Sequence, residues 1–162
     1  MNAEKLTWGD IEKLCERLAW RIRKDGFVPD VIVGVGRGGW IPARLLSDML
    51  GVEELYSIGV KYYSGIGRRR KKPILTQDFP GSARGKRILV VDDIAHTGRT
   101  LQLVRERLAG AREVRIATLH MKHHSRLKPE YCAKATNAWL EYPWESNEMK
   151  RELARVREGE SA

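Results

Sequence analysis

Two adjacent aspartates, Asp92 and Asp93, directly follow four apolar residues in the segment ILVVDDIAHTGRT, residues 88 to 100. Like charges side by side repel each other, so such a pair favours a place where a ligand or cation lies between the carboxylates. The hydroxyl groups of a sugar diol can donate hydrogen bonds to carboxylates, and Mg²⁺ prefers carboxylate and phosphate oxygens. The pair therefore indicates a sugar-phosphate site that can also hold Mg²⁺.

The turn AHTGRT, residues 95 to 100, follows at once and has the composition of a phosphate-binding helix start. The first turn of a helix offers unpaired N–H groups and a partial positive charge, both of which suit a phosphate. Thr97 and Thr100 add hydroxyl donors, and Gly98 lets the backbone come close to a ligand. The alternative is an ordinary capped helix beside a solvated acid pair.

A second segment, VGVGRGGWIPA at residues 33 to 43, also runs from an apolar stretch through glycines into a predicted helix. On its own it is equally compatible with a tight turn. A third segment, GRRRKK at 67 to 72, holds much of the net charge of +9. That charge fits a solvated loop, a nucleic-acid surface or a site for phosphorylated small molecules.

The elements that must position these residues follow from apolar periodicity and from proline and glycine. We expect helices at 7–25, 42–50 and 100–109, strands at 30–36, 54–63, 74–76, 87–91 and 114–119, and a last short strand near Trp139. Strands that alternate with helices predict an α/β fold with a parallel sheet and helices on both faces. Ligands of such sheets bind beyond the carboxyl ends of the strands, where Asp92 and Asp93 are expected.

Length and composition predict one domain over residues 1–162, with a core at about 7–145 and a helical tail at 146–162. Apolar residues make up 42% of the chain, enough for a packed core. The sequence has no apolar run long enough to cross a bilayer and no signal-peptide pattern, so we expect a cytoplasmic protein. Cys15 and Cys132 have neither metal-ligand spacing nor the look of a disulfide framework.

The segment VVDDIAHTGRT resembles the phosphoribosyl pyrophosphate signature of type I phosphoribosyltransferases: apolar residues, two acids, a short variable stretch, then Thr-Gly and a further Thr. The resemblance implies that Asp92 and Asp93 hold the ribose 2′- and 3′-hydroxyls and help to place Mg²⁺. It also implies a 5′-phosphate loop formed by Ala95, His96, Thr97, Gly98, Arg99 and Thr100. The family fold is an α/β domain with a small hood and C-terminal region that binds the base.

The same resemblance implies binding roles for the glycine segment at 33–43 and for the basic segment at 67–72. It implies that Arg37, Gly38 and Gly39 form a pyrophosphate-binding loop, in which Arg37 adds a fork of donors. Family members have a mobile loop between the second and third core strands that closes over the reacting centre and excludes water. Lys61, Arg68, Arg69 and Arg70 are the candidates here for contacting pyrophosphate.

Two C-terminal segments point to a nucleobase: LHMKHH at 119–124, which contains Lys122, and WLEYPWE. WLEYPWE at 139–145 is similar to the Trp-Ile-Glu-x-Pro-Trp-Asp segment of xanthine-guanine phosphoribosyltransferases. Carried over, Trp139 stacks on the purine, the backbone of Leu140 and Glu141 faces its C2 side, and Lys122 donates to O6. A lysine has donors only, so it suits a 6-oxopurine and disfavours the 6-amino group of adenine. The alternative for Trp139 and Trp144 is ordinary core packing.

His96 departs from the family pattern, because 6-oxopurine members usually have a further aspartate there, near purine N7. Histidine has a reference pKa of about 6.5 and can accept a proton at neutral pH. Three interpretations stay open: His96 handles the proton, His96 is a spectator, or the base differs from the one that the C-terminal segment suggests.

We therefore expect a purine phosphoribosyltransferase of the xanthine-guanine type that uses Mg²⁺, with Asp92, Asp93 and His96 at the reacting centre. Its partners would be phosphoribosyl pyrophosphate and a purine base, and relatives suggest a homo-oligomer, a dimer or tetramer. One rival is a regulator that keeps the sugar-phosphate pocket and binds nucleic acid. A second is an enzyme of the same fold that acts on adenine.

Overall fold

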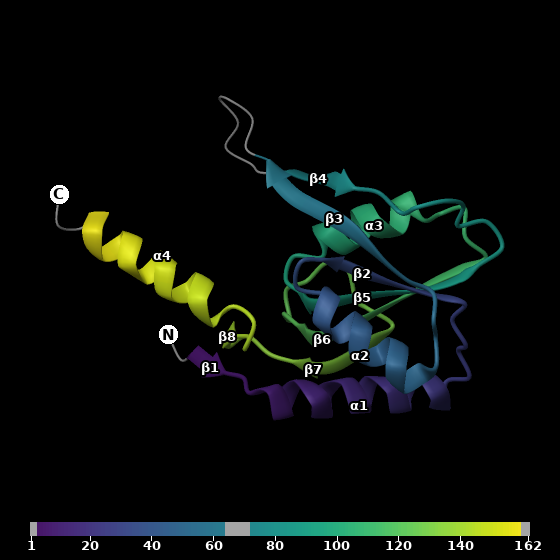
Figure 1. Cartoon of the computed structure of the whole chain (residues 1–162), viewed down its shortest axis with the longest axis horizontal. Helices are drawn as coiled ribbons and strands as arrows, with labels where there is room; N and C mark the ends of the chain where they lie inside the picture. The colour runs from purple at the N-terminus through teal and green to yellow at the C-terminus, as the bar shows by residue number, and fades with distance from the viewer. Residues whose placement is uncertain (1–2, 64–71, 160–162) are drawn as a thin grey trace.

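The computed structural model describes residues 3–63 and 72–159, and it has a layered α/β architecture (Figure 1). Within these residues the main sheet has six strands in the order β4-β3-β2-β5-β6-β7. Neighbours are parallel except β4, which runs antiparallel to β3 at one edge. The strands are β2 (Val31–Gly36), β3 (Leu55–Tyr63), β4 (Lys72–Gln77), β5 (Arg87–Ala95), β6 (Glu113–Met121) and β7 (Tyr131–Ala135).

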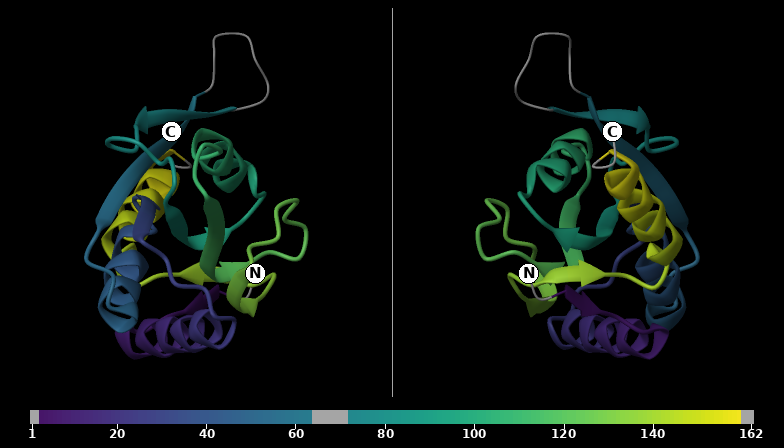
Figure 2. Two further views of the ribbon diagram at one scale, coloured as in Figure 1. Left: turned by 90° about the vertical axis from the view of Figure 1, so that its right-hand side faces the viewer. Right: turned by 90° about the vertical axis from the view of Figure 1, so that its left-hand side faces the viewer.

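Helices cover both faces of this sheet, as predicted (Figure 2). α1 (Trp8–Lys24) and α2 (Trp40–Leu50) lie on one face, and α3 (Arg99–Arg107) lies on the other. The central strand β5 shows the alternation: Leu89 and Val91 belong to the apolar cluster beneath α1 and α2, and Val90 belongs to the cluster beneath α3. A strand that is buried on both faces reads as a continuous apolar run, which is why this one is so visible in the sequence.

Local signals set the helix ends. Thr7 caps α1, and its hydroxyl and backbone form a reciprocal capping box with Asp10. Gly51 ends α2 in the left-handed conformation, with φ of 68°. α2 begins at Trp40, two residues before Pro42, so the proline occupies the first turn, where its missing N–H is harmless.

The structure differs from the predicted elements in several places, one of them the unpredicted strand β1 (Ala3–Lys5). β5 continues through Asp92 and Asp93 to Ala95, because its ladder with β6 extends to the pair Ala95 and Met121. β7 was not predicted, since the five residues YCAKA are too short and too mixed to show a periodicity. The strand near Trp139 exists, but it lies outside the main sheet.

That strand, β8 (Trp139–Glu141), pairs in parallel with β1 (Ala3–Lys5) and forms a separate two-stranded sheet. The helix α4 (Ser146–Gly159) follows it and extends away from the body of the molecule (Figure 1). Among the described residues, no helix combines the length and the apolar character that crossing a bilayer requires.

Candidate active site

The paired acids lie within β5, near the carboxyl edge of the parallel strands. Asp92 and Asp93 are each only 8% exposed. The backbone N–H of Asp93 donates to Oδ1 of Asp92 over 2.9 Å, and the N–H of Ile94 donates to Oδ1 of Asp93 over 2.7 Å. Because successive strand residues point to opposite faces, the two carboxylates enter different cavities, described below.

Burial makes both carboxylates poor anions in the unliganded protein. It raises the pKa of Asp93 to about 6. Burial, together with the charge of Asp93, raises the pKa of Asp92 well above its ordinary value. An opposite charge nearby would reverse this effect, because it favours the ionised form. The pair is thus built to gain from a bound cation or from several hydrogen-bond donors.

The glycine segment after β2 lies against this acid pair. A Cβ placed on Gly38 would lie 2.1 Å from Oδ2 of Asp93, and one on Gly39 would lie 2.3 Å from the carbonyl oxygen of Val91. Backbone atoms therefore exclude any side chain at Gly39, whereas a side chain at Gly38 would displace the carboxylate of Asp93. The peptide bond between Gly36 and Arg37 is cis. The predicted pyrophosphate segment and the acid pair are thus in contact, although they are more than fifty residues apart in the sequence.

The turn after β5 encloses the first cavity, which we call the loop cavity and which has a volume of about 440 Å³. Gly98 caps α3 with φ of 83°, a conformation that favours glycine. The cavity is lined by the whole predicted phosphate loop, by one acid of the pair on β5 and by a tyrosine on β3. The lining residues are Tyr62, Asp92, Ile94, Ala95, His96, Thr97, Gly98, Arg99, Thr100 and Leu101.

A second cavity of about 700 Å³, the aromatic cavity, adjoins the loop cavity, and Ile94 and His96 line both. Trp139 is 54% exposed at its wall, so this tryptophan is not a core residue. The lining combines β5, the turn after β6 and the C-terminal segment: Asp93, Ile94, His96, Lys122, His123, His124, Asn137, Ala138, Trp139, Leu140, Tyr142 and Glu145.

Two cationic or potentially cationic side chains face His96 in this cavity. Lys122 is 7% exposed, and its ammonium group donates to the carbonyl oxygen of Ala138. The rings of His96 and His124 lie edge to face, with centroids 5.2 Å apart. Desolvation, His124 and Lys122 together lower the pKa of His96. His96 is therefore uncharged at neutral pH and can accept a proton.

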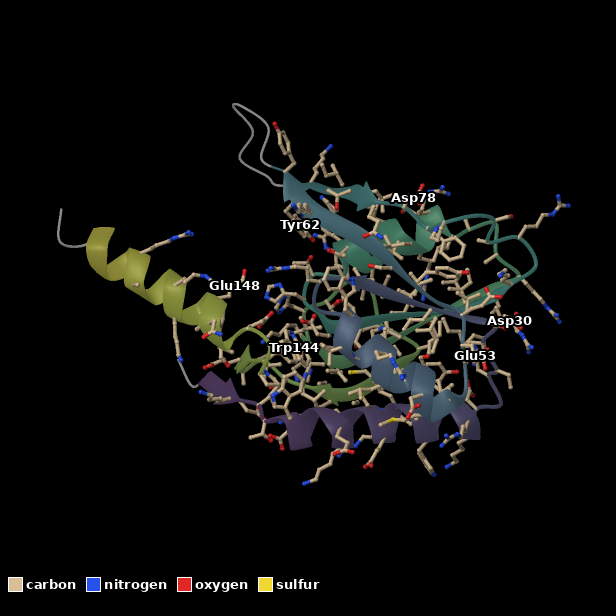
Figure 3. All side chains as sticks on the ribbon, in the orientation of Figure 1. Asp30, Glu53, Tyr62, Asp78, Trp144 and Glu148 are labelled. Atoms are coloured by element: carbon tan, nitrogen blue, oxygen red, sulfur yellow. The ribbon has the colours of Figure 1, made fainter. Side chains whose placement is uncertain are left out.

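A third cavity of about 340 Å³ lies beside the glycine segment, and Glu145 lines both it and the aromatic cavity. Here the guanidinium of Arg37 donates to both carboxylate oxygens of Glu148 on α4, over 2.9 and 2.7 Å. Figure 3 shows Glu148 on the part of α4 nearest the body, with Trp144 on the segment that leads into the helix. Burial and the charge of Asp93 raise the pKa of Glu145 to about 7.

A buried chain of hydrogen bonds holds the backbone of the acid pair in place. The hydroxyl of Tyr142 donates to the backbone carbonyl of Asp93 over 3.1 Å, and Nδ1 of His120 lies 2.9 Å from that hydroxyl. The ring of Tyr142 stacks on Trp144, with centroids 4.9 Å apart. Trp144 thus packs on Tyr142 and also lines the third cavity, whereas Trp139 lies at the wall of the aromatic cavity.

Some predicted residues lie elsewhere. Lys61 is exposed on β3 opposite Ile74 and lines none of the three cavities as the described residues form them. Arg68, Arg69 and Arg70 lie outside the described residues. Glu141 turns towards β1: its carbonyl accepts from the N–H of Leu6, and its carboxylate pairs with Lys5.

Sequence reasoning missed several residues that the fold brings to the cavities. Tyr62 comes from β3, Asn137 from the turn before β8, Glu145 from the residue just before α4, and Glu148 from the start of α4. Only Glu145 had a usable signal, since it ends the segment WLEYPWE. The other three are single polar residues whose neighbours in space are far away in the sequence.

The phosphoribosyl transferase domain family matches residues 3–148, which is most of the chain. The chain belongs to the phosphoribosyltransferase family. It is therefore a pentosyltransferase enzyme, and the fold described above is the type I fold of that family. The match confirms the resemblance drawn from VVDDIAHTGRT.

Individual relatives narrow the class to enzymes that act on purines. Xanthine-guanine phosphoribosyltransferase from Cereibacter sphaeroides is 31% identical over 147 residues, covering 86% of this chain and 85% of that protein. A purine phosphoribosyltransferase structure from Pyrococcus horikoshii has a TM-score of 0.81 and 40% identity, covering 89% of this chain and 94% of that one. A hypothetical protein from Neisseria gonorrhoeae, solved with bound ppGpp, has a TM-score of 0.80 and 26% identity, covering 98% and 99%.

Proposed function

We propose that this phosphoribosyltransferase transfers ribose 5-phosphate from phosphoribosyl pyrophosphate to a 6-oxopurine, and that it serves purine salvage. One observation carries the proposal: the loop cavity and the aromatic cavity share Ile94 and His96, with one acid of the pair in each. A sugar phosphate in the first cavity and a flat base in the second would therefore meet above the acid pair. The domain is proposed to be single, with residues 146–162 as a helical tail.

The chemistry requires a base, a leaving group and a sugar between them. A ring nitrogen of the purine attacks C1′ of the ribose, the bond from C1′ to pyrophosphate breaks, and the purine loses a proton. Positive charge develops on the sugar ring, and the carboxylates of Asp92 and Asp93 would stabilise it electrostatically. His96 would accept the purine proton, a role supported by its position in both cavities and by its lowered pKa, which favours the uncharged ring.

The remaining roles follow from the same placement. The backbone and hydroxyl groups of residues 95–100 would hold the 5′-phosphate, and Arg37 with Gly38 and Gly39 would hold pyrophosphate. Holding both substrates in line supplies much of the rate, because it converts a bimolecular step into an intramolecular one. Lys61, Arg68, Arg69 and Arg70 stay predictions for the pyrophosphate contact, as does homo-oligomerisation.

The acid pair fits Mg²⁺ by its donor chemistry. Mg²⁺ binds carboxylate and phosphate oxygens, and buried Asp92 and Asp93 would be ionised more readily beside a cation. When bound, the ion would neutralise charge on the pyrophosphate leaving group. Enzymes of this family generally use Mg²⁺ with phosphoribosyl pyrophosphate.

The choice of base rests on Lys122 and Trp139. Stacking of a base on an aromatic ring contributes about 1–3 kcal/mol in nucleic-acid complexes and does not depend on the identity of the base. Lys122 does discriminate, because its buried ammonium offers only donors and suits the 6-oxo group of guanine, xanthine or hypoxanthine. Leu140 would lie near the C2 side of the purine, and Glu141 stays a prediction there.

The test is direct. The protein is mixed with Mg²⁺, phosphoribosyl pyrophosphate and each of guanine, xanthine, hypoxanthine and adenine in turn, and nucleotide formation is followed by chromatography. We expect product with at least one 6-oxopurine and much less with adenine. A preference for adenine would overturn the substrate assignment, and no product with any base would overturn the proposed function.

A second ligand is suggested by the Neisseria gonorrhoeae structure with bound ppGpp. ppGpp carries a guanine and phosphate groups, the same chemistry for which the aromatic and loop cavities are proposed. We therefore propose that ppGpp competes with the substrates. Competitive inhibition against phosphoribosyl pyrophosphate would support this, and inhibition that excess substrate does not relieve would contradict it.

A further inference from the structure

Tyr62 has a position that the signature segments did not reveal. It lies near the end of β3 (Figure 3), and its side chain lines the loop cavity together with residues at the start of α3. There its hydroxyl oxygen accepts a hydrogen bond from Oγ1 of Thr100, over 3.2 Å. Thr100 belongs to the predicted phosphate loop, so one hydrogen bond joins β3 to that loop.

The pair of hydroxyls has a donor to spare. Two hydroxyl groups carry two protons, and their mutual hydrogen bond uses one, whichever group donates. Among the described residues, no protein atom accepts the second proton, so it faces solvent. A phosphate in the cavity would supply an acceptor, and a hydrogen bond to a charged acceptor is stronger than one between neutral groups.

Packing alone does not account for this side chain. Tyr62 remains 45% exposed, so burial of its ring contributes little to the core. The next residue, Tyr63, points to the opposite face of the strand and is 65% exposed. The two tyrosines thus differ in one respect that matters here: only the first lines the loop cavity as the described residues form it.

We propose that Tyr62 is a further substrate-binding residue, whose hydroxyl donates to the 5′-phosphate of phosphoribosyl pyrophosphate and of the nucleotide product. The inference rests on the proposed function, because that function places the 5′-phosphate in the loop cavity. Tyr62 would then attach β3 to the same phosphate that the residues at 95–100 hold. It would also favour phosphorylated over unphosphorylated ribose.

The reverse reaction separates the two phosphate sites, since the nucleotide carries the 5′-phosphate and pyrophosphate is a separate substrate. Tyr62→Phe should raise the KM for the nucleoside monophosphate about 10-fold, the loss typical of a hydrogen bond to a charged group. The KM for pyrophosphate should stay unchanged. Tyr63→Phe is the matched control and should change neither KM. A rise for pyrophosphate alone, or for neither substrate, would overturn the assignment.

Two further measurements test the role of Tyr62 separately from the proposed purine substrate. Calorimetric binding of phosphoribosyl pyrophosphate should weaken in Tyr62→Phe even if no base is turned over, so a wrong purine assignment would not hide the effect. Thr100→Val and the double variant complete a cycle, in which coupled hydroxyls should give less than additive losses. Fully additive losses, or a binding change that a lowered unfolding midpoint of the variant explains, would count against the proposal.

Discussion

At the scale of single residues, the buried acid pair lowers the stability of the unliganded protein, although the same carboxylates are proposed to bind the substrate and a cation. Asp93 is buried, its pKa is raised to about 6, and its carboxylate lies against Gly38. A group that prefers to be protonated when folded lowers the stability as the pH rises from its unfolded to its folded pKa, and the full cost remains above the folded pKa. The site therefore carries an energetic cost in the unliganded protein that substrate and cation are expected to offset.

Asp93→Asn should make this cost visible. The raised pKa means that the folded protein binds more protons than the unfolded chain between about pH 4 and pH 6, so wild-type stability falls as the pH rises through that window. The variant lacks this loss, and above about pH 6 its free energy of unfolding should exceed that of the wild type by about 3 kcal/mol. Its activity should drop about 100-fold or more. Denaturant unfolding at several pH values measures the difference.

Asp30→Asn is the control for Asp93→Asn, and its expected change in the free energy of unfolding has the opposite sign. Asp30 is exposed, and its pKa is lowered because its carboxylate accepts a hydrogen bond from the backbone N–H of Arg87. Asp30→Asn should therefore be less stable than the wild type at neutral pH. If both variants lost stability at neutral pH, the buried carboxylate of Asp93 would not carry the predicted cost.

The histidine pair predicts the acidic limit of activity. His96 must be uncharged to accept the purine proton, so the rate should fall as the pH drops through its lowered pKa. His124→Gln removes one cause of that lowering and should move the acidic limit of kcat to higher pH. His123→Gln is the control and should leave the limit in place. A limit that persists unchanged in His96→Ala would assign it to another group, and an unchanged rate would make His96 a spectator.

At the scale of elements, the start of α3 depends on one glycine. Gly98 has φ of 83°, and a Cβ there would lie 2.6 Å from the backbone nitrogen of Leu127. Gly98→Ala should therefore lower the free energy of unfolding by more than the roughly 1–2 kcal/mol expected from the left-handed backbone alone. Gly26→Ala isolates that backbone term, because Gly26 has φ of 71° and no atom within 4 Å of the added Cβ. Equal losses in the two variants would show that the contact with Leu127 relaxes freely.

The contact between α4 and the glycine segment after β2 predicts a competition. The guanidinium of Arg37, proposed to bind pyrophosphate, is held by the carboxylate of Glu148. An exposed ion pair contributes about 0.2–1 kcal/mol, so Glu148→Gln should lower the KM for phosphoribosyl pyrophosphate by up to about 5-fold. Glu54→Gln breaks a comparable exposed pair, with Lys86, and should have no effect on that KM. A higher KM in Glu148→Gln would mean that α4 supports binding instead of opposing it.

Elements whose signals are local could be predicted from the sequence, and elements that depend on distant partners could not. The capping residues Thr7 and Gly51 and the apolar run of β5 carry their structure in their own neighbourhoods. β1 and β7 were not predicted, because these short strands form by pairing with β8 and β6, which lie far from them in the sequence or carry their own signal. The site divides in the same way: the two signature segments were visible, whereas Tyr62 and Glu148 become part of it only through the fold.

At the scale of the whole molecule, the net positive charge is a feature that the residues of the site do not explain. The chain carries a net charge of +9, and the proposed substrate phosphoribosyl pyrophosphate is a strongly charged anion. Positive potential around a cleft raises the local concentration of an anionic substrate and its association rate. Such attraction is distributed over many side chains and needs no particular one.

This attraction predicts a selective salt dependence. Between about 0.1 M and about 1 M salt the Debye length falls from about 10 Å to about 3 Å, so distant charges cease to act on the substrate. The KM for phosphoribosyl pyrophosphate should therefore rise several-fold over this range, while the KM for the uncharged purine should stay constant, as initial-rate measurements would show. Excess duplex DNA at the lower salt concentration should not inhibit, because the charge serves a small anion. Inhibition by DNA, or an equal rise in both KM values, would show instead that the positive surface has another use.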